Sequence, residues 1–511
     1  MFPRFATVAV SPKSTRSVLA LLVLVGVAVA QNSSKPPLPA ASDPVVVDPG
    51  IRDASKFDPK RPLGRELETN VPDGFTLVTV GDCIISRPLL QYAAHDAAFQ
   101  LVLDILKRAD VTYGNMETSI FDLRHFTGYP YPGPDDVSLV AAPGVARELA
   151  QMGFDLVSRA NNHALDWGVE GMRETSHWLE AAGIGYAGAG ENLGLAQAAG
   201  YYEGAKGRIG LVSMASTFRP GSEALPAKDA APARPGINAL NVKKSITVSP
   251  DQMADVVRLR NALYPAEKSS QLPDQLSLLN NKFLLGKSFG FQYEMDPTDL
   301  SGILRAVRQG KQHADFLIVS IHSHEPAASA EAEAKNDFQD TPADFVQDLA
   351  HQAIDIGADT FVATGIHHLG PIEIYKGKPI FYGMGDFFWA DIQEPMAASV
   401  YQQYRKALAD ALIHPELATH ADLNNVSNAL GFAGQPPFDA MIAESRFDHG
   451  KVAEIRLYPV DLGYGMKLTE SGTPRLAGPE QSQRILQHVQ EMSQKYGTKI
   501  QVDGSVGVIR P

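Results

Sequence analysis

The chain has 511 residues, of which 44% are hydrophobic and 20% are charged, a balance typical of a globular protein and not of a disordered chain or a multi-span membrane protein. Its formal net charge of −13 and its pI near 5.5 exclude the basic footprint that nucleic-acid binders need, so we expect no nucleic-acid partner. The single cysteine, Cys83, excludes an intramolecular disulfide and a cysteine-rich zinc site. Any bound metal must therefore be held by His, Asp, Glu or Asn.

Residues 1–30 have the pattern of a signal peptide. A basic segment without acidic residues precedes a 13-residue apolar run, Val18 to Ala30, which ends in Ala-Val-Ala. The run is shorter than the roughly 20 residues that a membrane span needs. We therefore expect cleavage after Ala30 and export to the periplasm or the cell surface. The alternative is an uncleaved anchor, which would be the protein's link to a membrane. Residues 31–70 contain seven prolines and predict an extended linker.

Apolar, β-branched runs alternate with amphipathic stretches between residues 71 and 465. This rhythm is typical of an α/β fold. Two segments interrupt it, 220–297 and 391–435, and their composition predicts largely helical insertions. Residues 466–511 are expected to form a C-terminal tail with a helix. The predicted strands are 75–80, 154–157, 208–214, 315–321 and 360–363, the predicted helices are 94–107, 144–152, 169–182, 300–312 and 344–356, and a hairpin is predicted over 372–382.

Polar residues follow five of the strand-like runs directly. In open α/β sheets ligands bind beyond the carboxyl ends of the strands, so these residues are expected at one rim. A lone His or Asn after a strand is more often structural, but five such places in one chain favour a site. Carboxylate, amide and imidazole donors without thiolates suit one or two divalent ions, Mn, Fe or Zn. The residues are Asp82, Asn115 with Glu117, Asn162 with His163, His322, and His367 with His368.

These motifs resemble the CapA family of poly-γ-glutamate capsule proteins, within the calcineurin-like metallophosphoesterase superfamily. The most specific match is Ala160-Asn161-Asn162-His163-Ala164-Leu165-Asp166-Trp167-Gly168. The resemblance implies a four-layer α/β/β/α sandwich of the metallo-dependent phosphatase type, carrying the helical insertions, over residues 71–465. The other matching elements are Gly81-Asp82 followed by Arg87, Asn115-Met116-Glu117-Thr118, Arg234 to Asn238, and Ile374 to Tyr382 followed by Gly385-Asp386-Phe387.

The chain departs from the family pattern at places that matter for metal binding. It has His322-Ser323-His324-Glu325 where the family has His-x-Gly-x-Glu, and adjacent His367-His368 where the family has His-Pro-His. Asp386 replaces the usual Asn, and Ile84 stands where the wider superfamily has a His. Neighbouring residues on an extended backbone point to opposite faces, so His367 and His368 reach one metal together only if the turn is irregular. A lost ligand would leave one strong site, unless His324 takes the vacated place.

The resemblance implies a role for each metal ligand. Asp82 is expected as a terminal ligand to one ion and Glu117 as the carboxylate that bridges both. Asn162 is expected on the second ion, with His322 and either His367 or His368 completing the coordination.

Three further residues carry expected roles around the metal. His163 is the expected general acid, and Asp166 is expected to orient its ring, to cap the following helix, or to do both. Arg87 is a candidate for binding an anionic substrate group, although an exposed structural Arg is the plainer interpretation. Cys83 is expected to be a small buried residue and not a nucleophile.

Two functions of different classes follow from these expectations. The first is an exported metal-dependent hydrolase acting on a phosphoester or amide bond of an anionic substrate, linked to capsule or poly-γ-glutamate metabolism. The second is a non-catalytic protein that handles an anionic polymer and assists its synthesis or export, with the capsule synthesis machinery as a partner. Metal analysis together with a screen of phosphodiester and γ-glutamyl substrates distinguishes them.

Overall fold

The computed structural model describes residues 69–131, 138–268, 271–329, 341–390, 401–402, 404–431 and 438–511. The expected signal peptide and nearly all of the proline-rich linker lie outside these residues. Among the helices in the described ranges, none combines the length and apolarity needed to cross a membrane.

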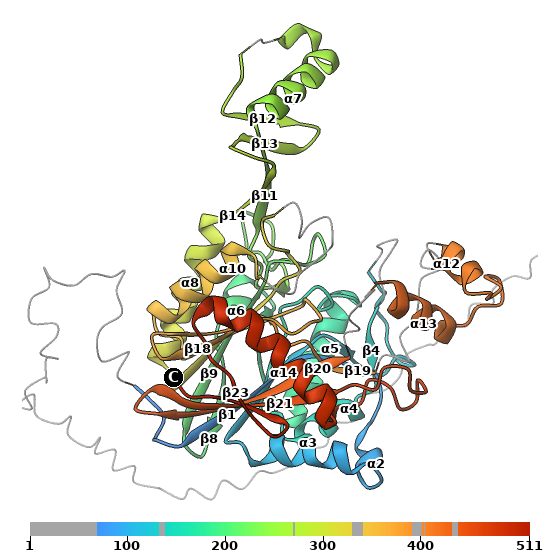
Figure 1. The fold of residues 1–511 in the computed structure, drawn as a ribbon, viewed down its shortest axis with the longest axis vertical. Helices are drawn as coiled ribbons and strands as arrows, with labels where there is room; N and C mark the ends of the chain where they lie inside the picture. Colours follow the sequence, from blue (N-terminus) through green and yellow to red (C-terminus); the bar gives the residue numbers. More distant parts are fainter. Residues whose placement is uncertain are drawn as a thin grey trace, which may run out of the picture. The chain divides into compact units, whose positions relative to one another are not determined.

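The first large sheet has ten strands, and β1 (Phe75–Ile85) is central to it (Figure 1). On one side β1 pairs in parallel with β2 (Val111–Met116) and then β5 (Leu156–Ser158) and β6 (Gly185–Ala187) follow. On the other side it pairs antiparallel with β20 and, at its carboxyl end, in parallel with β19. The remaining members are β19 (Asp386–Ala390), β20 (Asp439–Asp448), β21 (Lys451–Asp461), β22 (Arg475–Leu476), β23 (Gln501–Asp503) and β24 (Val506–Ile509).

The second large sheet has six strands in the order β17-β18-β16-β15-β9-β8. Its central strand β15 (Phe316–His322) is buried throughout and pairs in parallel with both neighbours. The others are β8 (Gly200–Gly204), β9 (Gly207–Ala215), β16 (Thr360–Thr364), β17 (Ile372–Tyr375) and β18 (Lys378–Phe381).

Three apolar cores stack these elements into four layers. The core between the sheets joins side chains such as Phe75 from β1 and Phe316 from β15, whose ring centroids are 5.1 Å apart. Outside the first sheet a second core includes α3 (Ala97–Arg108), α4 (Gly144–Met152) and α5 (Gly168–Ala182). Outside the second sheet a third core includes α8 (Pro297–Gln312) and α10 (Asp344–Asp355). The predicted α/β/β/α sandwich is confirmed.

Local signals explain where the helices begin and end. Helix α3 begins three residues later than the predicted 94 because the Asp96 side chain accepts the backbone N–H of Phe99 and caps it. Helix α4 ends at Gly153, which has φ of +106° and closes the last turn in the left-handed conformation. The predicted hairpin forms as β17 and β18, with both turn residues, Lys376 and Gly377, at positive φ.

The first insertion differs from its helical prediction. Its described residues contain one α-helix, α7 (Pro250–Leu263), but its main element is a four-stranded sheet in the order β12-β13-β11-β14. The sequence holds the signal that the prediction missed, since β11 reads VKKSITV and is rich in β-branched residues. A two-residue turn at positive φ, Leu279-Asn280, joins β12 to β13. The strands are β11 (Val242–Val248), β12 (Gln275–Leu278), β13 (Asn281–Leu285) and β14 (Gly290–Met295).

The second insertion and the C-terminal segment differ in how closely they match their predictions. Within its described residues the second insertion is helical as predicted, with α12 (Arg405–Asp410) and α13 (His420–Gly431). The segment after residue 465 has the expected helix, α14 (Pro479–Ser493), but it is more than a tail. Leu486 lies in the core between the sheets, and β24 pairs with β21 of the first sheet. The C-terminal segment therefore belongs to the same compact unit as the two sheets, Asp58–Pro511.

Candidate metal centre

Strand register places the polar residues in two rows that face one another. Across the first sheet, Asp82 on β1 is level with Asn115 on β2 and with Asp386 on β19, and Asn115 is level with Ser158 on β5. Across the second sheet, His322 on β15 is level with Thr364 on β16. Because parallel strands end at the same edge, residues far apart in sequence meet at one rim, as predicted.

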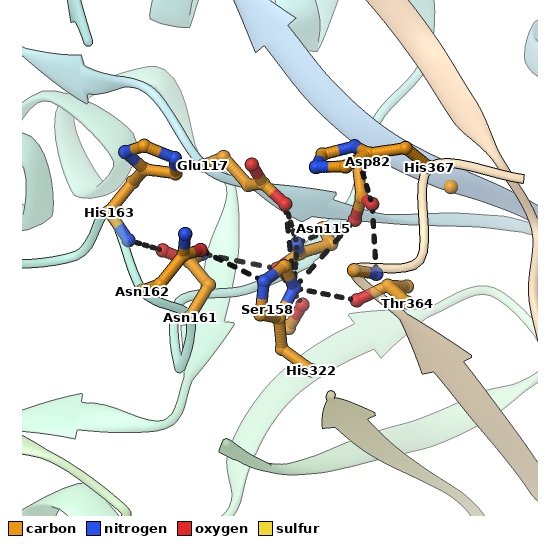
Figure 2. A network of polar contacts seen from close by, with 12 residues as sticks. Asp82, Asn115, Glu117, Ser158, Asn161, Asn162, His163, His322, Thr364 and His367 are labelled. Carbon is orange, nitrogen blue, oxygen red and sulfur yellow. Dashed lines mark hydrogen bonds and ion pairs between the residues drawn. The ribbon is translucent and has the colours of Figure 1, made fainter. Parts of the chain in front are cut away.

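Asp82 is the centre of the cluster (Figure 2). It is fully buried, and its Oδ1 accepts a hydrogen bond from the Asn115 amide at 2.8 Å. Its Oδ2 accepts one from the backbone N–H of Gly365 at 2.9 Å. The preceding residue has to be a glycine, because a Cβ on Gly81 would lie 1.8 Å from the carbonyl oxygen of Gly385. Burial raises the pKa of Asp82, although these hydrogen bonds and His367 act against the rise.

Glu117 follows β2 and lies beside Asp82. Its Oε1 accepts from the Asn115 amide at 3.2 Å, while its buried Oε2 has no hydrogen-bond donor among the described residues. Burial, and then the negative charge of Asp82, raise the pKa of Glu117 well above its usual value. Two buried carboxylates held together in this way are destabilised as anions unless a cation binds between them.

His322 presents its two ring nitrogens to different partners. Nδ1 lies 3.4 Å from Glu117 Oε1 and 3.2 Å from the Thr364 hydroxyl. Nε2 lies 2.9 Å from Asn162 Oδ1 and 3.0 Å from Nε2 of His324. Burial, and then the neighbouring His324, lower the pKa of His322 well below its ordinary value, so the ring is neutral and keeps a lone pair for a metal.

His367 is the member of the histidine pair that joins the cluster. Its backbone has φ of +54°, so the turn is irregular and the ring reaches Asp386 Oδ1 at 2.9 Å and Asp82 Oδ2 at 4.0 Å. Burial acts to lower the pKa of His367, but Asp386 outweighs it and raises the pKa to about 8. His368 is half-buried and belongs to neither of the donor groups formed by the described residues.

The carboxylate and imidazole donors form two groups in the described part of the chain. One is Asp82, Glu117 and His322, and the other is Asp82, His367 and Asp386, each with ligand atoms within 4.8 Å of one another. The shared residue is Asp82, whereas the resemblance implies that Glu117 bridges. Asp386 enters as a donor, although sequence analysis notes it only as a replacement for Asn.

His163 and Asp166 form a hydrogen-bonded pair beside this cluster. His163 Nδ1 lies 2.8 Å from Asp166 Oδ2, and the ring is partly exposed while the carboxylate is buried. Asp166 also accepts the backbone N–H of Leu139 and lies 3.0 Å from the guanidinium of Arg219. Helix α5 begins at Gly168, and its N-cap residue Trp167 makes no side-chain cap, so Asp166 contacts His163 and does not cap the helix. Sequence reasoning missed Arg219, which follows β9 and matches no motif.

Two residues singled out in the sequence have structural contacts instead. Arg87 is 6% exposed, and its guanidinium donates to the Tyr92 hydroxyl at 3.0 Å and to the Thr469 carbonyl at 2.7 Å. These contacts fasten the segment after β1 to the C-terminal region, and neither of them reaches the cluster. Cys83 is fully buried, and burial followed by Asp82 raises its pKa, as expected for an unreactive thiol.

The donor set fits a divalent ion. Three buried carboxylates lie against two imidazoles, and the described residues offer Glu117 Oε2 no donor. A cation offsets the mutual repulsion of the carboxylates, and the neutral ring of His322 supplies a lone pair. Oxygen and imidazole donors without thiolate suit Mn, Fe or Zn. Divalent metal binding is therefore the chemistry that this arrangement supports.

Fold and site together define a four-layer α/β protein with a carboxylate–histidine centre at the strand ends. The chain matches the bacterial capsule synthesis protein family PGA_cap over residues 76–390 and belongs to that family. Two uncharacterized proteins of Sinorhizobium fredii are each 41% identical over 472 residues, covering 90% of this chain and 98% of theirs. The PGA biosynthesis protein CapA of Bacillus subtilis is 22% identical over 325 residues, covering 63% of this chain and 65% of its own.

A crystal structure of a hypothetical protein from Thermus thermophilus is 14% identical and covers 76% of this chain and 99% of that chain, with a TM-score of 0.34. A putative 5'-nucleotidase from Staphylococcus aureus covers 61% of this chain and 49% of that chain at 10% identity, with a TM-score of 0.29.

Proposed function

We propose that this protein is an exported metal-dependent hydrolase that acts on a phosphoester or amide bond of an anionic substrate in capsule or poly-γ-glutamate metabolism. The observation that carries the proposal is the buried cluster around Asp82 with the His163–Asp166 pair beside it. A protein that only binds a polymer has no need of an oriented, partly exposed histidine next to such a cluster. Export rests on the signal-peptide pattern of residues 1–30.

Asp82, Glu117, Asn162, His322 and His367 are the proposed holders of one or two ions. A bound divalent ion lowers the pKa of a water and stabilises the charge that develops on the attacked group. Asp386 Oδ1 accepts a hydrogen bond from Nδ1 of His367 at 2.9 Å, and this contact fixes the orientation of the imidazole ring. The Asn115 amide, which donates to both Asp82 and Glu117, keeps the two carboxylates in place.

His163 is the proposed proton donor to the leaving group. Asp166 accepts from Nδ1 at 2.8 Å, which leaves Nε2 for the substrate. Arg219 lies 3.0 Å from the other carboxylate oxygen of Asp166 and holds this side chain from the opposite side. The partial exposure of the His163 ring allows contact with a substrate that enters from solvent.

The names of the relatives favour a second candidate, since Bacillus subtilis CapA is described as a PGA biosynthesis protein. In that case the chain assists synthesis of an anionic polymer, with the capsule machinery as its partner, and the metal stabilises the fold or recognises the ligand. Hydrolytic turnover distinguishes the two candidates.

The test combines metal analysis with a substrate screen. Purified protein is analysed for bound divalent metals, and initial rates are measured on phosphodiester and γ-glutamyl substrates before and after chelator treatment. We expect bound metal, and turnover that the chelator abolishes and added metal restores. Bound metal without turnover on any substrate would favour the second candidate. The proposed metal-dependent hydrolase function would be refuted if the protein held no metal and a chelator left its rates unchanged.

A further inference from the structure

The Nε2 side of His322 holds a donor set that the two carboxylate groups do not include. Asn162 Oδ1 lies 2.9 Å from this nitrogen, and Nε2 of His324 lies 3.0 Å from it (Figure 2 shows the Asn162 contact). Two neighbouring ligands bound about 2.0–2.1 Å from one ion lie about 2.8–3.4 Å apart, so these separations suit neighbouring positions around a single ion. His324 occupies the position of the glycine in the His-x-Gly-x-Glu pattern of the CapA family. Its imidazole is therefore a donor that this pattern does not contain.

The backbone holds His324 in this position. Its N–H donates to the Thr217 hydroxyl at 2.8 Å, which ties the segment after β15 to the segment after β9. The next residue, Glu325, accepts hydrogen bonds from Ser216 at 2.8 Å and from Ser323 at 2.7 Å. The turn that carries His324 is therefore fixed on both sides before any ligand binds.

The close approach of the two rings also requires glycine at position 365. A Cβ on Gly365 would lie 2.8 Å from Cδ2 of His324 and 3.0 Å from Cε1 of His322. The same glycine donates its N–H to Asp82. One residue thus serves both sides of the centre, because it leaves room for the imidazole pair and orients the central carboxylate.

The other ring nitrogen of His322 is placed to complete this arrangement. The Thr364 hydroxyl lies 3.2 Å from Nδ1 and accepts its proton in the tautomer that frees Nε2. A ligating histidine commonly donates its second ring N–H in this way, which fixes the tautomer and the ring orientation. The Asn115 amide nitrogen also lies 3.2 Å from Nδ1, but its two N–H groups donate to Asp82 and Glu117 and leave none for the ring.

We propose that His324 is a metal ligand, binding through Nε2 the same ion as His322 and Asn162, and that this additional imidazole gives the centre a preference for Zn²⁺ over Mn²⁺. Imidazole donors favour zinc, iron and nickel, whereas carboxylate and carbonyl oxygens suit manganese and magnesium. Replacing a glycine by a histidine beside Asn162 therefore shifts the donor set toward zinc. The inference rests on the proposed metal-dependent function and names the ligand and the ion class for that site.

The test measures metal affinity and does not depend on activity. Dissociation constants for Zn²⁺ and for Mn²⁺ are determined by competition with a chelator for wild type, His324→Ala, His324→Asp and the control His368→Ala. We expect His324→Ala to weaken Zn²⁺ binding by at least about tenfold and Mn²⁺ binding by less than about threefold. His324→Asp replaces an imidazole by a carboxylate and should weaken Zn²⁺ while strengthening Mn²⁺. His368→Ala should change neither.

The Co²⁺-substituted proteins supply a second readout, since the visible absorption of bound Co²⁺ responds to the loss of a nitrogen ligand. We expect the spectrum to change in both His324 variants and to stay the same in His368→Ala. Thermal unfolding of the metal-free proteins checks that each variant folds. If both His324 variants bind Zn²⁺ and Mn²⁺ within about twofold of wild type and keep its Co²⁺ spectrum, the inference is wrong while the proposed function stands. A wild type that binds neither ion overturns both.

Discussion

The two donor groups that share Asp82 differ in how their charges are balanced. Glu117 and His322 are almost completely buried, and burial disfavours the charged form of each. In the other group His367 is 19% exposed and forms an ion pair with Asp386 at 2.9 Å. The first group thus depends on a cation to offset its carboxylates, whereas the second already has a counter-charge in the imidazolium.

This difference predicts an order of occupancy. An ion entering the Glu117–His322 side meets neutral imidazole and unbalanced carboxylates, so binding there gains the most. An ion entering the His367–Asp386 side has to displace the proton of His367, so its affinity depends on pH. We therefore expect one tight ion and one weaker, pH-sensitive ion.

The largest effect is expected for Asp82→Asn, because Asp82 belongs to both groups. The amide keeps the shape of the side chain but removes the charge, so both ions should be lost. We expect bound metal to fall close to zero and turnover to drop by more than about 10⁴-fold, which corresponds to several kcal/mol of lost stabilisation.

Glu117→Gln is the comparison variant. It should lose the tight ion while the His367–Asp386 side still binds metal at high pH. If Glu117→Gln loses both ions and Asp82→Asn keeps one, the bridging carboxylate is Glu117, as the resemblance implies. Metal stoichiometry of the two variants decides between the assignments.

The sequence predicts the composition of this centre better than its division into groups. Four of its residues are identifiable from sequence because each follows a buried strand, and residues at strand ends lie together at the rim of a sheet. They are Asp82, Glu117, Asn162 and His322. The choice of His367 over His368 is not identifiable, since it depends on one backbone angle, φ of +54°, that sequence spacing does not specify. The helical prediction for 220–297 fails because a mixed composition hides the β-branched residues of β11.

Proton donation should be separable from metal binding in both groups. His163→Ala is expected to lower turnover by about 10²–10⁴-fold, the usual range for a lost general acid, with metal content unchanged. His125→Ala is a matched control, because His125 pairs with Asp122 at the same i,i+3 spacing and 2.6 Å but is exposed. We expect the control to retain wild-type rates. Loss of metal from His163→Ala would show that this ring is a ligand.

The ion pair of the second group should make the metal-free protein sensitive to pH. The pKa of His367 is raised to about 8 by Asp386, above the value near 6.5 of an unfolded histidine. The pair therefore stabilises the fold at pH 6 and loses this contribution as the pH rises through 8. We expect a loss of about 2 kcal/mol in the free energy of unfolding between pH 6 and pH 9.

Asp386→Asn identifies the source of that loss. Denaturant unfolding of chelator-treated protein should show a flatter pH profile for this variant than for wild type over the same range. The other groups facing the ring are Asp82 and, in aromatic contact, His324 and Trp389. Equal slopes in the variant and wild type would assign the pH dependence to a titratable neighbour, Asp82 or His324.

The smallest effect on activity is expected at Arg87, which lies outside both groups. Arg87→Met removes hydrogen bonds to Tyr92 and Thr469 and a cation–π contact, 5.2 Å from the guanidinium carbon to the Tyr92 ring centroid. We expect the free energy of unfolding to fall by about 1–3 kcal/mol, because the Thr469 carbonyl loses its charged donor. By contrast, kcat/KM should stay within about twofold of wild type, since these contacts lead away from the cluster. A rise in KM with unchanged stability would instead restore the substrate-binding interpretation, and Arg87→Lys would then recover part of the affinity for an anionic substrate.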